Sequence, residues 1–132
     1  DCYPGQLNQV FMNVLANAID ALTDHNPEET TPHQITIRTS SSPDGKWVAV
    51  AIADNGPGIP DEIQHRIFDP FFTTKAVGKG TGLGMSISYQ IITEKHGGIL
   101  TCHSEPGQGT EFIIQVPTTQ IADPKAVELT AV

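Results

Sequence analysis

The chain has 132 residues, the size of one ordinary domain, and a formal net charge of −8. That charge argues against nonspecific nucleic-acid binding, which relies on an excess of lysine and arginine. There is no apolar run of 18 residues and no signal-peptide pattern, so we expect a soluble, cytoplasmic domain that does not itself insert into a membrane. Because the chain starts without Met, we expect it to belong to a larger protein, which could be membrane-anchored.

The first predicted element is an amphipathic helix over residues 6–23. Its apolar residues have the spacing of one buried helix face: Leu7, Val10, Phe11, Val14, Leu15, Ala18, Ile19 and Leu22. Asn13 and Asn17 lie one turn apart, well round from that face. Asparagine is a poor residue inside a helix, so this pair indicates either a ligand site or a solvated helix face. An amide oxygen can ligate Mg²⁺.

The remaining elements are predicted from period and turn signals: strands at 34–39 and 47–53, a short helix at 60–67, a loop at 69–80, a helix at 82–95, and strands at 99–103 and 110–116. Leu83, Ile87, Tyr89 or Gln90, and Ile91 would form the apolar face of the second long helix. This order predicts an α+β fold, a two-layer α/β sandwich with a mixed, mostly antiparallel sheet and helices on one face. We expect the domain to span 1–117 and a tail to occupy 118–132.

A phosphate site is indicated by four glycines that alternate from Gly78 to Gly84, just before the second long helix. Glycine lets the backbone approach a ligand closely, and the following helix presents free N–H groups and a positive dipole end. The spacing matches neither a dinucleotide fingerprint nor a Walker loop. Arg66, Lys75 and Lys79 lie close by in sequence, where an anionic ligand is expected. The alternatives are a flexible glycine linker and a solvated loop.

Cys2 and Cys102 have neither CxxC nor metal-ligand spacing. A single disulfide between them is one alternative, and two buried thiols are the favoured one.

Five motifs follow one another along the chain: Asn13-Val-Leu-Ala-Asn17, Asp54-Asn-Gly-Pro-Gly58, Phe68-Asp-Pro-Phe-Phe-Thr-Thr-Lys75, Gly80-Thr-Gly-Leu-Gly84 and Gly107-Gln-Gly-Thr110. They resemble the N box, first glycine box, F box, and second and third glycine boxes of the catalytic ATP-binding domain of sensor histidine kinases. That superfamily shares the Bergerat ATP-binding fold with gyrase, a heat-shock chaperone and mismatch-repair ATPases. The resemblance covers roughly residues 5–117.

The resemblance implies a set of ATP-binding residues: Asn13, Asn17, Asp54, Gly56, Gly58, Ile59, Lys75, Gly80, Thr81, Gly82, Leu83, Gly84 and Thr110. Within this set, Asn17 is the implied Mg²⁺ ligand, and Asn13 and Lys75 belong to the catalytic centre. Asp54 would accept a hydrogen bond from the adenine amino group and so select adenine over guanine. Thr110 would hold the water layer round adenine, and Phe71 or Phe72 would pack the lid.

Asn13 separates two activities within the superfamily. The ATPases carry glutamate at this position, where it can act as a general base. An amide cannot take that proton, and a neutral imidazole nucleophile already has a lone pair. Asp20 departs from the lysine or arginine that many histidine kinases carry there, so we do not expect it to bind nucleotide directly. His65 has a proline five residues on, as in a phosphoacceptor box, but it lacks the adjacent acid, and we interpret it as coincidental.

The resemblance therefore implies a domain that binds Mg²⁺-ATP and donates the γ-phosphate to a histidine. That histidine would lie on a separate dimerisation domain of the same protein, which in turn would serve a response regulator. Two alternatives remain open: an ATP-hydrolysing conformational ATPase of the same superfamily, and a non-catalytic nucleotide-sensing module.

Overall fold

The computed structural model describes residues 1–23, 32–70, 72 and 84–119. Its elements follow the predicted order: α1 (Pro4–Thr23), β1 (Ile35–Ser41), β2 (Trp47–Asp54), α2 (Asp61–Gln64), α3 (Gly84–Gln90), a π-helical turn η1 (Ile91–Lys95), β3 (Ile99–Glu105) and β4 (Gly109–Pro117). The strands form a four-stranded sheet in the order β1-β2-β4-β3. Every pairing among these described strands is antiparallel, so no parallel pair of the expected mixed sheet occurs here.

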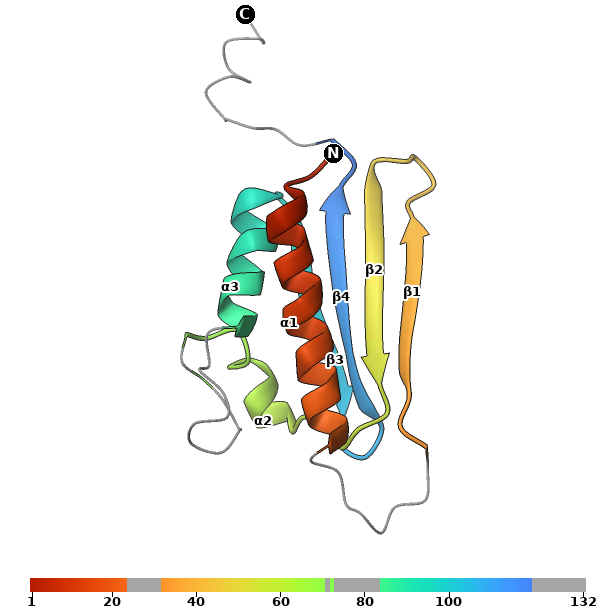
Figure 1. Cartoon of the computed structure of the whole chain (residues 1–132), viewed down its shortest axis with the longest axis vertical. Coiled ribbons are helices and arrows are strands. Elements are labelled where there is room, and N and C mark those ends of the chain that lie inside the picture. Colours follow the sequence, from red (N-terminus) through yellow and green to blue (C-terminus); the bar gives the residue numbers. More distant parts are fainter. Residues whose placement is uncertain (24–31, 71, 73–83, 120–132) are drawn as a thin grey trace, which may run out of the picture.

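The helices lie on one face of the sheet, with α1 and α3 side by side (Figure 1). This confirms the predicted α+β sandwich. The interior is formed by one cluster of buried residues: Val10, Val14, Ile52, Ile67, Ile91, Ile92, Leu100, Phe112 and Ile114. Because side chains alternate along a strand, the helix-side face of β2 carries Ile52 and then Asp54. The strand that builds the core therefore ends with a carboxylate on the same face.

The apolar stripe of α1 is confirmed with one exception. Val10, Val14, Ala18 and Leu22 are buried, as the spacing predicts. Ile19 is 52% exposed, so its predicted burial is wrong. A helix resting on a sheet buries only a narrow row of side chains, and Ile19 lies at the margin of the predicted stripe.

The second long helix differs from its prediction in two ways. The α-helix ends at Gln90, and the chain continues as η1 rather than as α-helix to residue 95. Tyr89 and Gln90 are exposed, so their predicted place on the apolar face is wrong, whereas Ile91 is buried and Ile87 packs against the core as predicted. Ser86 and Ser88 are buried as well. Ser88 is accommodated because its hydroxyl donates to the carbonyl oxygen of Gly84 at 2.8 Å.

The helix expected over residues 60–67 is only a single turn, α2. Beyond it the backbone continues with tighter turns, in which the Arg66 N–H donates to the Ile63 carbonyl at 2.9 Å. Cys2 and Cys102 are free thiols; Cys2 is exposed, so the expectation of two buried thiols fails for it. Within the described parts of the chain, no helix combines the length and apolar character needed to cross a bilayer.

The His96 side chain joins η1 to the start of α1 through two hydrogen bonds. It is 1% exposed. Nδ1 lies 3.0 Å from the Ile91 carbonyl oxygen, which can only accept, so Nδ1 carries the proton. Nε2 then accepts the Tyr3 backbone N–H at 3.0 Å. Both ring nitrogens are thus paired in the neutral tautomer.

Replacing His96 with alanine should lower the free energy of unfolding by about 2–4 kcal/mol, through the cavity and the orphaned Tyr3 N–H. The matched control is His103→Ala, at an exposed position of β3, which should change it by no more than about 0.5 kcal/mol. Urea unfolding measures both. Equal midpoints for the two variants would contradict the structural role given to His96.

Candidate nucleotide-binding site

Asp54 lies at the end of β2 and faces the helices. It is 9% exposed. Its Oδ1 accepts the Gly56 backbone N–H at 2.9 Å. Burial raises the pKa of the Asp54 carboxyl, while backbone hydrogen bonds from Gly56 and Thr110 partly oppose that rise. The carboxylate is therefore held in place by the backbone, and its second oxygen can accept from a ligand.

The charge of Asp54 also affects β3, which lies two strands away in the sheet. The pKa of the Cys102 thiol is raised to about 12, first by burial and then by the negative charge of Asp54. Cys102 is thus a neutral packing residue, and not a nucleophile, at ordinary pH.

Two glycines allow the first and third glycine boxes to pack against each other. Gly58 has φ +78°, and a Cβ there would overlap the Glu105 carbonyl oxygen. Gly109 has φ +101°, and a Cβ there would overlap the carbonyl oxygen of Asp54. Only glycine combines these backbone angles with such close approach. The turn after β2 and the turn before β4 therefore form one unit around Asp54.

Ser104 and Gln64 join these segments, and sequence reasoning missed both. The Ser104 hydroxyl lies 2.7 Å from the Ile59 N–H, 2.9 Å from the Gly109 carbonyl oxygen and 2.9 Å from the Thr110 hydroxyl. Gln64 Nε2 donates to the Ile59 and Ser104 carbonyl oxygens at 2.9 and 2.7 Å. The available signal was Ser104 itself, a polar residue on the inward-facing side of a strand.

Asn13 connects α1 to α3. Its Nδ2 donates to the Gly84 carbonyl oxygen at 3.1 Å and to the Ser88 hydroxyl oxygen at 3.0 Å. The Ser88 hydroxyl hydrogen is itself directed at the Gly84 carbonyl. These partners fix which end of the Asn13 amide carries the nitrogen. Only Oδ1 remains to face a ligand.

One row of α1 runs over the site. Asn13 contacts Gly84 at the start of α3. Two turns later, a Cβ on Gly56 would lie 3.4 Å from the Ala21 Cβ, so this end of α1 lies against the turn after Asp54. Asn17 is one turn from each of these α1 residues. It is half-buried, between the carboxylate end of the site and the start of α3.

Replacing Asn13 with aspartate should lower the free energy of unfolding by about 1–3 kcal/mol. The carboxylate would put acceptors against the Gly84 carbonyl, which also only accepts. Asn8→Asp, at an exposed position of the same helix, makes the same chemical change as a control. Chemical denaturation compares the two; an equal loss in both variants would show that the Asn13 contacts add nothing.

Six predicted site residues or packing residues lie outside the described part of the chain: Lys75, Gly80, Thr81, Gly82, Leu83 and Phe71. Their roles remain predictions. Phe72 is described, packs against the core, and has the Arg66 guanidinium 4.8 Å from its ring centroid. The F-box aromatic thus has a packing role.

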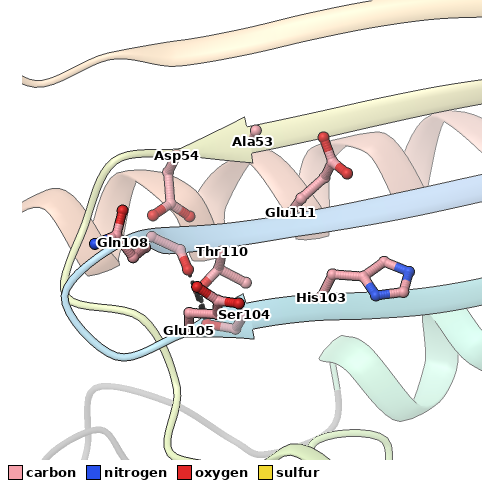
Figure 2. A pocket seen from close by; sticks show the side chains of 9 residues that line it. Ala53, Asp54, His103, Ser104, Glu105, Gln108, Thr110 and Glu111 are labelled. Carbon is pink, nitrogen blue, oxygen red and sulfur yellow. Dashed lines mark hydrogen bonds between the residues drawn. The ribbon is translucent and has the colours of Figure 1, made fainter.

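A hollow lies at the same end of the sheet and reaches its opposite face (Figure 2). Asp54, Ser104 and Thr110 of the candidate site also line this hollow, and on the opposite face of the sheet its rim includes His103, Glu105 and Glu111. Glu111 alternates with Thr110 and Phe112, which face the helices, and pairs with Arg38 of β1 at 3.1 Å. Two carboxylates make this rim unfavourable for an anion as highly charged as a nucleotide triphosphate. The helix-side face is therefore the better candidate site. There Asp54 lies near the asparagine row of α1, which consists of Asn13 and Asn17.

The sequence profile of the family described as "Histidine kinase-, DNA gyrase B-, and HSP90-like ATPase" matches residues 2–120. The chain belongs to this family. Among its relatives, the sensor kinase CckA of Brucella abortus strain 2308 is 41% identical over an alignment of 126 residues that covers 86% of this chain and 12% of CckA. The two-component sensor PprA of Pseudomonas aeruginosa is 42% identical over 118 residues, 89% of this chain and 12% of PprA.

Solved structures of this ATPase family agree with the fold. The nucleotide-free catalytic domain of the histidine kinase ThkA superposes with a TM-score of 0.71 at 35% identity, covering 89% of this chain and 70% of that one. Full-length ShkA in complex with AMPPNP gives 0.70 at 31% identity, covering 91% and 23%. The chain therefore corresponds to the catalytic ATP-binding domain of sensor histidine kinases, and spans a small part of the curated relatives it matches.

Proposed function

We propose that this domain binds Mg²⁺-ATP and donates its γ-phosphate to a histidine on a separate dimerisation domain of the same protein. The phosphoryl group would then pass to a response regulator. We place the domain in the cytoplasm, where ATP is supplied. The observation that carries the proposal is the pair of hydrogen bonds by which the Asn13 amide nitrogen is fixed to Gly84 and Ser88.

Recognition of the base is assigned to the floor formed by Asp54 and Thr110. The two residues stand opposite each other in the pairing of β2 with β4, and both are buried. The Asp54 oxygen that does not bind Gly56 is an acceptor with no proton of its own above its raised pKa. An exocyclic amino group such as that of adenine supplies the matching donor. A buried acceptor of this kind rejects a base that offers a carbonyl instead.

Asn13 favours phosphoryl transfer to histidine over hydrolysis. Its Nδ2 is held by two acceptors and Oδ1 belongs to an amide, so the side chain cannot take a proton from water. A neutral histidine needs no such base. Its nitrogen lone pair forms the P–N bond while the β,γ-bridging P–O bond breaks and ADP leaves. The domain's contribution is to hold the nucleotide in position for that attack.

The amide oxygens of the asparagine row fit Mg²⁺. Asn13 Oδ1 and the side-chain oxygen of Asn17 are hard donors of the type the ion prefers, and phosphate oxygens and water would complete its shell. Among the described residues, no group of three histidine, cysteine or acidic side chains could hold a metal alone. The ion would therefore be bound together with ATP, where it neutralises phosphate charge.

Two other activities fit less well. A hydrolysing ATPase needs a base near the γ-phosphate, and the residue at that position is the fixed amide of Asn13. A non-catalytic sensing module would be expected to have lost part of the site. Within the described residues, Asn17, Asp54 and Thr110 are all present on the helix-side face.

The test is incubation with γ-labelled ATP, alone and with a dimerisation domain from a related sensor kinase. We expect no stable label on this domain, slow phosphate release, and label on the supplied histidine. A dimerisation domain with that histidine changed to alanine is the control. Brisk phosphate release by this domain alone, or acid-stable label on it, would reject the proposal.

A further inference from the structure

The Ser104 hydroxyl has its full complement of hydrogen-bond partners. The Gly109 carbonyl oxygen can only accept, so it takes the single hydroxyl hydrogen. The Ile59 backbone N–H can only donate, so it takes one lone pair. The third contact, at 2.9 Å to the Thr110 hydroxyl, must then use the second lone pair. Thr110 is therefore the donor in that contact. Figure 2 shows how the two side chains face each other.

This assignment settles the polarity of Thr110. Its one hydroxyl hydrogen points at Ser104, which leaves only lone pairs for any other partner. Thr110 stands in register with Asp54, which also offers only acceptors when ionised. Two adjacent side chains of the floor thus present acceptors and no hydrogen.

We propose that Ser104 is a positioning residue that sets base specificity by fixing the direction of the Thr110 hydroxyl. With the hydroxyl fixed in this way, the floor can accept a hydrogen bond from a 6-amino group, or from a water bound to one. It cannot donate a hydrogen bond to a 6-oxo group. This inference rests on the proposed ATP site, and it assigns part of the discrimination against 6-oxopurines to a residue on β3 that need not touch the nucleotide.

A purely structural role for Ser104 predicts something different. The tie between Ile59 and β3 is made a second time by Gln64, whose Nε2 reaches the Ile59 and Ser104 carbonyl oxygens. Gln64 has no contact with the Thr110 hydroxyl among the hydrogen bonds of the described residues. Loss of Gln64 loosens the same loop and leaves the Thr110 hydroxyl directed at Ser104. The two residues therefore separate anchoring from polarity.

The experiment is calorimetric measurement of Kd for Mg²⁺-ATP and for Mg²⁺-inosine triphosphate, which carries a 6-oxo group. The wild type should prefer ATP. Ser104→Ala frees the Thr110 hydroxyl to rotate and donate, and should lower the ATP-to-inosine triphosphate preference by about three- to tenfold, the worth of one neutral hydrogen bond. Ser104→Thr keeps the hydroxyl and should retain the preference for ATP over inosine triphosphate. Gln64→Ala should weaken both nucleotides alike.

Ser104→Cys provides a near-isosteric variant with a weak acceptor, so the test does not depend on Ser104→Ala alone. An unchanged preference in both variants, or an equal fall in Gln64→Ala, would overturn this inference and leave the proposed function standing. Failure of the wild type to bind ATP would overturn the proposed function itself. Thermal unfolding of each variant shows that the measured protein is folded.

Discussion

Replacing Asp54 with asparagine is expected to weaken ATP binding by about 10- to 100-fold, or roughly 1–3 kcal/mol. The asparagine oxygen would keep the hydrogen bond from Gly56. Its NH₂ group would then face the adenine amino group, so that two donors meet in a buried place. The loss should appear as a higher Kd in calorimetry, with GTP binding less affected than ATP binding.

Asp44→Asn is the matched control for this change. It removes one carboxylate from the turn between β1 and β2, at an exposed position away from the site. ATP affinity should be unaltered in that variant. Undiminished ATP affinity in Asp54→Asn would remove the assignment of Asp54 to base recognition.

The same carboxylate predicts a pH dependence. Burial raises the Asp54 pKa above 3.8, its ordinary value. For the free domain, the contribution of Asp54 to stability is fully present below that ordinary value and is lost as pH rises through the raised pKa. ATP binding has the opposite sign, because only the ionised carboxylate accepts without donating. We expect Kd for ATP to rise as pH falls through the raised pKa, with no such step in Asp54→Asn.

Replacing Gly109 with alanine is expected to lower the free energy of unfolding by about 3 kcal/mol or more, an effect typical of steric strain in a packed interior. Gly109 has φ +101°, and its new Cβ would collide with the backbone of Asp54, including its carbonyl carbon at 3.0 Å. The backbone that holds Asp54 must then shift, so ATP affinity should fall with stability.

Gly107→Ala is the control for the backbone angle alone. Gly107 also has positive φ, +82°, but nothing lies within 4 Å of a Cβ built there. Its replacement should lower the free energy of unfolding by only about 1–2 kcal/mol, because alanine disfavours the left-handed conformation. Denaturant unfolding of the two variants separates collision from backbone angle. Equal losses would mean that the close contact between the third glycine box and Asp54 is absent.

The sequence predicted those features that depend on local periodicity. The apolar stripe of α1 and the two hairpins follow from side-chain spacing, because a helix or strand buries one face. Tyr89 shows the limit of that approach. An apolar pattern placed it on the buried face of the second long helix, yet it is 41% exposed, while Ser86 and Ser88 are buried. Tyr89 instead stacks on Phe68, whose ring centroid is 5.1 Å away.

Contacts between distant segments were beyond the reach of the sequence. Asp54 and the glycine boxes were predicted from motif chemistry, but Ser104 and Gln64 carry no motif. Ser104 reaches Ile59, 45 residues away in sequence, and Gln64 reaches Ser104 across 40. Which polar side chain meets which backbone group depends on the register of the folded sheet and on the turn that follows β2. No period along the chain encodes that meeting.

The most direct test of the site is an amide NMR titration of the domain with Mg²⁺ and a non-hydrolysable ATP analogue. The helix-side assignment predicts the largest shift changes at Asp54, Gly56 and Thr110, and at Asn17 on α1. His103 and Glu111, on the opposite face of the sheet, should change little. Shift changes concentrated at His103 and Glu111, with Asn17 unmoved, would place the nucleotide on the opposite face of the sheet, where Figure 2 shows these two side chains, and contradict the account.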